Sequence, residues 1–331
     1  MIRKNNIQVA LIQHSFKQTK EKTIEYTLEM IRQAAINGAD LVVLQELHTS
    51  EYFCQSENVD FFKYAESFEN EIEIFSQVAR KNNIVLVTSL FEKRANGLYH
   101  NTAVVFEKDG SIAGKYRKMH IPDDPGFYEK FYFTIGDNEF RPIETSIGKL
   151  GILICWDQWF PEAARLMTLG GAEILIYPTA IGFSPNEPKE EQNRQLNAWL
   201  GVQKGHAIAN GVFVIAVNRV GFEENKLIES IESKTTTESK IAESSESKIA
   251  QDSTKYADSA KSNQINGIEF WGHSFIFGPQ GEEIAMAKTQ NDEIIKAIIN
   301  MDRIAEVRHM WPFLRDRRIE FYQNITKRFI D

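Results

Sequence analysis

Short apolar runs with few polar residues recur along this chain, and they constrain its fold more than any other feature. A strand that is apolar on both sides is buried on both faces, so it must lie inside a layered structure. Predicted strands of this kind are "IQVALIQ" (7–13), "ADLVVLQE" (39–46), "NIVLVTSL" (83–90), "KLGILIC" (149–155), "EILIYPT" (173–179), "VFVIAVN" (212–218) and "EIIKAII" (293–299).

Amphipathic stretches with a helical period lie between these runs. Residues 19–37 place Ile24, Leu28, Ile31 and Ala35 on one face, and similar stretches cover 68–81, 161–169 and 190–210. Hairpins are predicted at Asp109-Gly110 and at Pro279–Gly281. Helices interspersed with strands and hairpins predict an α/β fold in which two mixed β-sheets pack together with helices outside, as a single domain over 1–331.

Residues 222–266 interrupt this pattern. The tract is rich in Ser, Thr, Glu and Lys, contains no glycine or proline, and repeats the pentamer Glu-Ser-Lys-Ile-Ala. Such a composition buries too little apolar surface to order itself, and a long polar insertion costs little loop entropy. We therefore expect a disordered surface loop here, with no catalytic role.

Charge and cysteine usage exclude several classes of protein. The net charge of −8 argues against nucleic acid as the main partner. No apolar window approaches the roughly 18 residues that a membrane span requires, and the apolar run after the N-terminus is too short for a signal peptide. Cys54 and Cys155 form no disulfide framework and no zinc motif. We expect a soluble protein of a reducing compartment, the cytoplasm, with no metal.

Cys155 lies where an apolar strand ends and a helix is about to begin. Such a turn presents a side chain at the end of a sheet, next to unpaired amides of the following helix that can hold an anion. A thiol needs a base or a nearby cation to react. Glu46 and Lys118 also lie at predicted strand ends and could supply these roles, although each alone has the ordinary explanation of a solvated surface charge.

Taken together, the strings "LVVLQEL", "GKYRKMHIP" and "GILICWDQWFPEAAR" resemble the three signature segments of the nitrilase (carbon–nitrogen hydrolase) superfamily, in the same order. The resemblance implies a four-layer α-β-β-α sandwich that forms homo-oligomers and uses no cofactor. It implies Glu46 as general base and acid, Lys118 as the oxyanion-stabilising cation, and Cys155 as nucleophile. The backbone N–H of Trp156 would be a second oxyanion donor.

The strings "EYFCQ", "HIPDDPGFYEKFYF" and "YPTAIG" further resemble a branch of that superfamily that hydrolyses a small, cationic ureido compound. This likeness implies that Glu129 is a supporting acid that orients Lys118 or the leaving group. A substrate ammonium needs carboxylates and an aromatic wall. The residues expected to line that pocket are Tyr52, Asp123, Asp124 and Trp159, with His120 beside them.

The sequence is compatible with two other functions. One is a related amidase or a hydrolase of carbamoyl amino acids, whose anionic substrate would need arginine in the pocket. The acidic segment "HIPDDPG" favours a cationic substrate instead. The other is a binding or scaffold protein that kept the fold and lost turnover, against which the intact set of Glu46, Lys118 and Cys155 argues.

Overall fold

Two six-stranded mixed sheets form the centre of the molecule in the computed structural model, which describes residues 4–225, 266–287 and 291–330. In spatial order the first sheet contains β15 (Glu293–Asn300), β1 (Asn6–Gln13), β2 (Leu41–Leu44), β3 (Val85–Ala95), β4 (Leu98–Phe106) and β5 (Ile112–Arg117). The second contains β14 (Glu283–Met286), β13 (Phe275–Phe277), β10 (Phe213–Val217), β8 (Ile174–Pro178), β7 (Gly148–Ile152) and β6 (Ile143–Thr145).

The most apolar runs form the parallel centre of each sheet. β1, β2 and β3 pair in parallel, as do β7, β8 and β10, whereas the outer strands pair antiparallel. Every residue of β2, β8 and β10 is buried. Side chains from both sheets share one hydrophobic core, which includes Val9, Leu41, Ile152 and Ile176. The two sheets therefore pack face to face.

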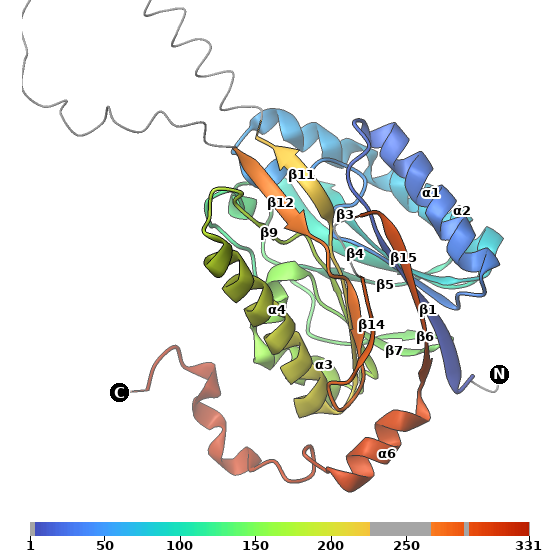
Figure 1. The fold of residues 1–331 in the computed structure, drawn as a ribbon, viewed down its shortest axis with the longest axis vertical. Coiled ribbons are helices and arrows are strands. Elements are labelled where there is room, and N and C mark those ends of the chain that lie inside the picture. Colours follow the sequence, from blue (N-terminus) through green and yellow to red (C-terminus); the bar gives the residue numbers. More distant parts are fainter. Residues whose placement is uncertain (1–3, 226–265, 288–290, 331) are drawn as a thin grey trace, which may run out of the picture.

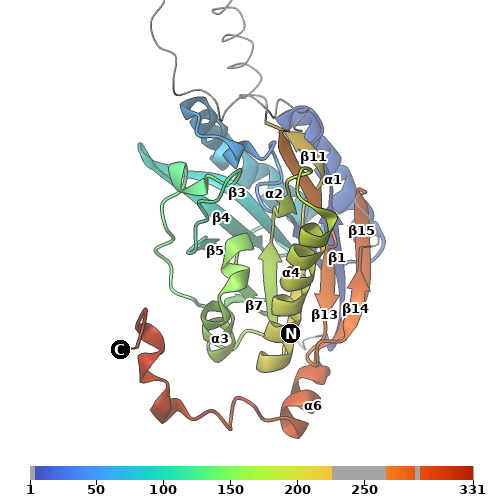
Figure 2. The same ribbon diagram turned by 60° about the vertical axis from the view of Figure 1, so that its left-hand side comes forward.

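Helices cover the outer face of each sheet (Figures 1 and 2). α1 (Lys20–Ile36) and α2 (Phe68–Asn82) pack on the first sheet, and α3 (Pro161–Leu169) and α4 (Lys189–Asn210) pack on the second. The Thr19 side chain caps α1 by accepting the N–H of Lys22, and Gly38 follows the helix with a φ of +90° that favours glycine. The α-β-β-α sandwich expected from the sequence is confirmed.

A small third sheet corrects the expected boundaries of the polar insertion. β11 (Val220–Glu224) pairs antiparallel with β12 (Gly267–Trp271), which also pairs with β9 (Gly182–Phe183). Phe222–Glu224 therefore belong to a strand, because their backbone groups pair with β12 and Glu223 forms an ion pair with Arg219. Asn225 and Asn266, at the ends of these strands, are also ordered, and the N–H of Asn225 donates to the carbonyl of Asn266 at 3.1 Å. Residues 226–265 of the predicted disordered loop lie outside the described residues.

The chain ends outside the sandwich. After α6 (Asp302–Met310), residues 311–330 run along the outside of the body as an arm of short turns (Figures 1 and 2). Among the described ranges of the chain, no helix is long and apolar enough to cross a membrane.

Candidate active site

Cys155 lies between β7 and α3, at the first position of a single 3-10 turn, Cys155–Trp159. The strand that the sequence predicted to run through Cys155 ends at Ile152. The backbone of Cys155 has a φ of +41°, a conformation that costs a non-glycine residue about 1–3 kcal/mol and persists only where neighbours impose it. Contacts around the turn must therefore hold the thiol in place.

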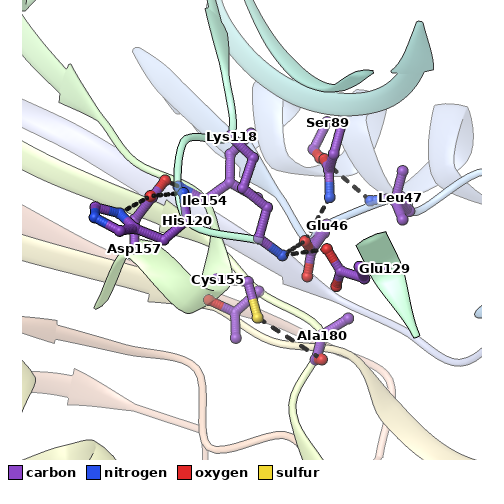
Figure 3. Close-up of polar contacts among 12 residues, drawn as sticks. Glu46, Leu47, Ser89, Lys118, His120, Glu129, Ile154, Cys155, Asp157 and Ala180 are labelled. Carbon is purple, nitrogen blue, oxygen red and sulfur yellow. Dashed lines mark hydrogen bonds and ion pairs between the residues drawn. The ribbon is translucent and has the colours of Figure 1, made fainter. Parts of the chain in front are cut away.

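Asp157 supplies those contacts, and sequence reasoning missed it. Its buried carboxylate accepts the N–H of Ile154 (2.9 Å) and the hydroxyl of Tyr116 (2.9 Å) on one oxygen. The other oxygen accepts the backbone N–H (3.0 Å) and ring Nδ1–H (2.7 Å) of His120. Asp157 thus ties the turn of Cys155 to the segment that follows Lys118 (Figure 3). The available signal in the sequence was an acidic residue only two positions after the cysteine, next to an apolar run.

The ammonium of Lys118 lies between two carboxylates (Figure 3). Its Nζ is 2.8 Å from Oε1 of Glu46 and 2.6 Å from Oε2 of Glu129, and all three side chains are fully buried. Lys118 follows β5, Glu46 lies in the turn after β2, and Glu129 opens a short 3-10 turn at 129–131. Side chains from three separate segments therefore meet beside Cys155.

The two oxygens of Glu46 differ. Oε1 accepts Lys118 Nζ and also the amide of Asn101 at 2.7 Å. Oε2 is buried and has no hydrogen-bond partner among the described residues. Because no described donor occupies its lone pairs, Oε2 is the oxygen placed to take the thiol proton.

The charges at this site act on one another. Burial and the carboxylate of Glu46 raise the pKa of the Cys155 thiol well above its usual value, so the thiol is protonated at rest. Burial alone lowers the pKa of Lys118, but the carboxylates of Glu129 and Glu46 more than offset this and raise it well above its usual value. Burial, together with the neighbouring charge of Glu46, raises the pKa of Glu129 to about 7 against the opposing effect of Lys118.

A cavity of about 1090 Å³ opens at this site. Its wall includes Cys155, Glu129, Trp156 and Trp159, whereas the fully buried Glu46 and Lys118 lie behind the wall. Among the lining residues that the structure describes, the charged ones are all acids, with no lysine, arginine or histidine: Glu57, Asp124, Glu129 and Glu187. The cavity therefore suits a cation.

Three of the expected pocket residues do not line this cavity. Asp123 is turned to the surface, with its carboxylate 3.9 Å from Lys130, because its turn directs only Asp124 toward the cavity. The ring of His120 is held by Asp157 and stacks on Phe160, with 3.7 Å between ring centroids. Tyr52 is buried and donates its hydroxyl to Glu129 at 2.8 Å, so it supports an acid of the site instead of forming its wall.

Replacing Asp157 with asparagine is expected to loosen the cysteine turn. The amide nitrogen of Asp157→Asn would face donors, so two hydrogen bonds to a charged group are lost and the free energy of unfolding falls by about 3 kcal/mol. Urea denaturation measures this loss, and alkylation of Cys155 by iodoacetamide should slow in the same variant. Glu162→Gln, at an exposed position of α3, is the control and should change stability by less than about 0.5 kcal/mol. Equal stability of the two variants would contradict this role of Asp157.

No group of three or more His, Cys, Asp or Glu side chains within the described part of the chain is arranged to hold a metal ion. The arrangement that the structure does contain is a protonated thiol, a carboxylate oxygen free to take its proton, and a buried ammonium.

Comparison with known proteins identifies the family of this chain. The family model described as carbon-nitrogen hydrolase matches residues 8–309. The N-carbamoylputrescine amidase of Oryza sativa subsp. japonica is 36% identical, over 96% of this chain and 94% of that protein. The citrullinase of Francisella tularensis is also 36% identical, over 98% and 99%. A crystal structure of a carbon-nitrogen hydrolase from Helicobacter pylori G27 is 52% identical, with a TM-score of 0.85 over 98% of this chain and 100% of that one. This chain therefore belongs to the carbon–nitrogen hydrolase family, the nitrilase superfamily, and is a C–N hydrolase.

Proposed function

We propose that this hydrolase cleaves N-carbamoylputrescine, a small ureido compound with a distal ammonium, to putrescine, carbon dioxide and ammonia. The observation that carries the proposal is the charge of the cavity, whose described lining holds four acids and no basic side chain. The full-length similarity to plant proteins named N-carbamoylputrescine amidase supports the same substrate. The reaction would form putrescine for polyamine synthesis from agmatine.

The proposed reaction begins with proton transfer from the Cys155 thiol to Oε2 of Glu46 as sulfur attacks the ureido carbon. The oxyanion that forms is stabilised by the Lys118 ammonium and the backbone N–H of Trp156. Because two nitrogens donate into a ureido carbonyl, it is a poor electrophile, so this stabilisation and the placement of the thiol are the critical terms. Glu129 holds Lys118 in position.

Collapse of the tetrahedral species breaks the bond to the terminal nitrogen. Ammonia leaves with the proton held by Glu46, and an alkylcarbamoyl thioester remains on Cys155. Glu46 then takes a proton from water as the water attacks the thioester. Glu46 passes this proton to the sulfur as the C–S bond breaks, which releases the Cys155 thiol and the carbamate in its acid form. The carbamate decomposes to carbon dioxide and putrescine. No cofactor enters these steps.

In the pocket, the ring of Trp159 and the carboxylates of Asp124 and Glu187 lie on the cavity wall and are the groups we assign to the distal ammonium. An aromatic face and a carboxylate both attract a cation, whereas a carboxylate on the substrate would face like charge. Citrulline also has an ammonium at its distal end, but it carries an α-carboxylate beside it, and this added like charge is the difference that separates it from N-carbamoylputrescine.

A substrate panel tests the proposal. Ammonia release is measured from N-carbamoylputrescine, citrulline, carbamoyl-β-alanine, glutamine and short aliphatic amides. We expect kcat/KM for N-carbamoylputrescine to exceed that for citrulline by at least about 100-fold, because like-charge contacts in a binding site cost several kcal/mol. A preference for any member of the panel that carries a carboxylate (citrulline, glutamine or carbamoyl-β-alanine) would overturn the assigned substrate while leaving the family membership intact.

We also propose that the protein is a cytoplasmic homo-oligomer. The arm at 311–330 exposes large apolar side chains in a single copy, among them Phe313, Phe321 and Phe329. Exposed apolar side chains that cluster on one segment mark an interaction surface. Light scattering coupled to size exclusion would report the mass of the assembly, and a monomer at micromolar concentration would contradict the proposal.

A further inference from the structure

A buried ion pair lies behind the loop that carries Glu46. Arg219 directly precedes β11 and is 1% exposed, and its Nη1 is 2.6 Å from Oε1 of Glu223 in the same strand. The guanidinium also lies over the ring of Phe270, 5.5 Å from its centroid. Neither Arg219 nor Glu223 lines the cavity. Because this buried pair does not face the cavity, it does not contact the substrate there, and its role must come from the protein groups that it binds.

The guanidinium of Arg219 binds the loop after β2. Nη2 donates to the carbonyl of Leu47 at 2.9 Å and to that of Glu46 at 3.4 Å, and Nη1 donates to the carbonyl of Ser50 at 3.0 Å. Leu47 has a φ of +47°, so this loop is strained beside the general base. The planar guanidinium of Arg219 thus fixes the backbone from which the Glu46 side chain extends.

The carboxylate of Glu223 reaches the second acid of the site. Its Oε2 accepts the backbone N–H of Tyr52 at 2.6 Å. The hydroxyl of Tyr52 donates to Oε1 of Glu129 at 2.8 Å, and Oε2 of Glu129 pairs with Lys118. The pair therefore connects to Glu46 through backbone carbonyls and to Glu129 through one tyrosine.

We propose that Arg219 and Glu223 form a positioning pair that sets the placement of both carboxylates around Lys118. The inference rests on the proposed thiol mechanism, in which Oε2 of Glu46 must meet the thiol proton. A displacement of about 1 Å at a catalytic group can cost about 100-fold in rate. The directional hydrogen bonds of the buried Arg219 guanidinium prevent such a displacement. Apolar side chains packed at the same place would not fix the backbone as closely.

Glu223→Gln tests the pair with little change of shape. Its amide has one oxygen for two donors, so either Arg219 or the N–H of Tyr52 loses its partner. We expect kcat to fall at least tenfold and KM to change by less than about twofold, because the pair lies outside the cavity while the base is displaced. Glu224→Gln is the matched control: it makes the same chemical change one residue later, at an exposed position, and should keep the wild-type kcat.

Arg219→Lys provides an independent variant, since it keeps the charge and cannot bind three carbonyls and a carboxylate at once. It should show the same loss of kcat, and the double variant should lose little more than either single one because the pair acts as a unit. Thermal unfolding confirms that each variant is folded before its kinetics are compared. If Glu223→Gln is not recovered folded, the Arg219→Lys result decides the proposal.

The rate of Cys155 alkylation by iodoacetamide separates this inference from the proposed function, because it needs no substrate. If the wild-type protein hydrolyses no compound of the panel, the function fails, while slower alkylation in both variants still supports the positioning role. Wild-type kcat and alkylation rate in folded Glu223→Gln and Arg219→Lys would overturn the inference. So would a loss confined to KM, which would place the pair in substrate binding.

Discussion

Glu46→Gln is expected to reduce the rate of hydrolysis by at least about 100-fold while leaving the protein folded, since general acid–base catalysis contributes about 10²–10⁴. Glutamine keeps the volume of the side chain, and its oxygen can still accept Lys118 Nζ and the Asn101 amide. Its amide nitrogen would take the place of Oε2 and cannot accept the thiol proton. Burial, the largest of the causes that raise the pKa of Cys155, is unchanged in this variant, so the sulfur would remain a thiol. Ammonia release at saturating substrate measures the loss.

The control for this variant is Glu129→Gln, which makes the same change on the other side of Lys118. We expect a smaller loss, because Glu129 positions Lys118 and receives no proton from the thiol in the proposed reaction. Circular dichroism establishes that both variants are folded. A Glu46→Gln protein with more than a tenth of the wild-type rate would remove Glu46 from the role of base.

Lys118→Met is expected to abolish turnover and also to lower the free energy of unfolding by about 3–5 kcal/mol, the usual cost of leaving a buried charge unpaired. Methionine preserves most of the aliphatic packing, so the loss arises from the missing ammonium. Without it, Glu46 and Glu129 would be two buried carboxylates with no cation between them. Urea denaturation at pH 7 measures the change in stability.

The pH dependence of the stability of Lys118→Met follows from the direction in which the pKa of Glu129 is shifted. Burial already raises the pKa of Glu129 to about 7 with Lys118 in place, and removing Lys118 removes an opposing effect. The folded variant would then bind more protons than the unfolded chain, so its stability falls as pH rises above the ordinary carboxyl range of about 4.5 and is regained as pH falls. Lys118→Met should recover stability between pH 7 and pH 5 relative to wild type. Adding Glu129→Gln should recover part of it at pH 7. A Lys118→Met protein as stable as wild type at pH 7 would contradict the account.

The apolar runs predicted the strands well, because a strand that is buried on both faces consists of consecutive apolar residues. Residues 41–44, 174–178 and 213–217 are central, fully buried strands, as their composition indicated. The motif around Cys155 predicted the position of the thiol but not its conformation. Ile154 and Cys155 extend the apolar run, yet the strand ends at Ile152, because the carboxylate of Asp157 draws the backbone into a turn.

Side-chain directions in turns were not predictable from the sequence. Asp123 and Asp124 are neighbours with the same chemistry, and only Asp124 lines the cavity, because contacts with distant segments set the course of that turn. Arg219 and Glu223 were missed for a related reason. Both act through hydrogen bonds to backbone groups far along the chain, such as the carbonyl of Leu47 and the N–H of Tyr52, and such contacts produce no recognisable spacing in the sequence.

Ammonia release from N-carbamoylputrescine by the wild-type protein, beside Cys155→Ala and Cys155→Ser, shows directly whether the Cys155 sulfur breaks the carbon–nitrogen bond. We expect the wild-type protein to release ammonia and putrescine in equal amounts, and both variants, although folded, to release none above the uncatalysed rate. Turnover by Cys155→Ala at a rate near that of wild type would show that the carbon–nitrogen bond is broken without the Cys155 sulfur, and would contradict the account.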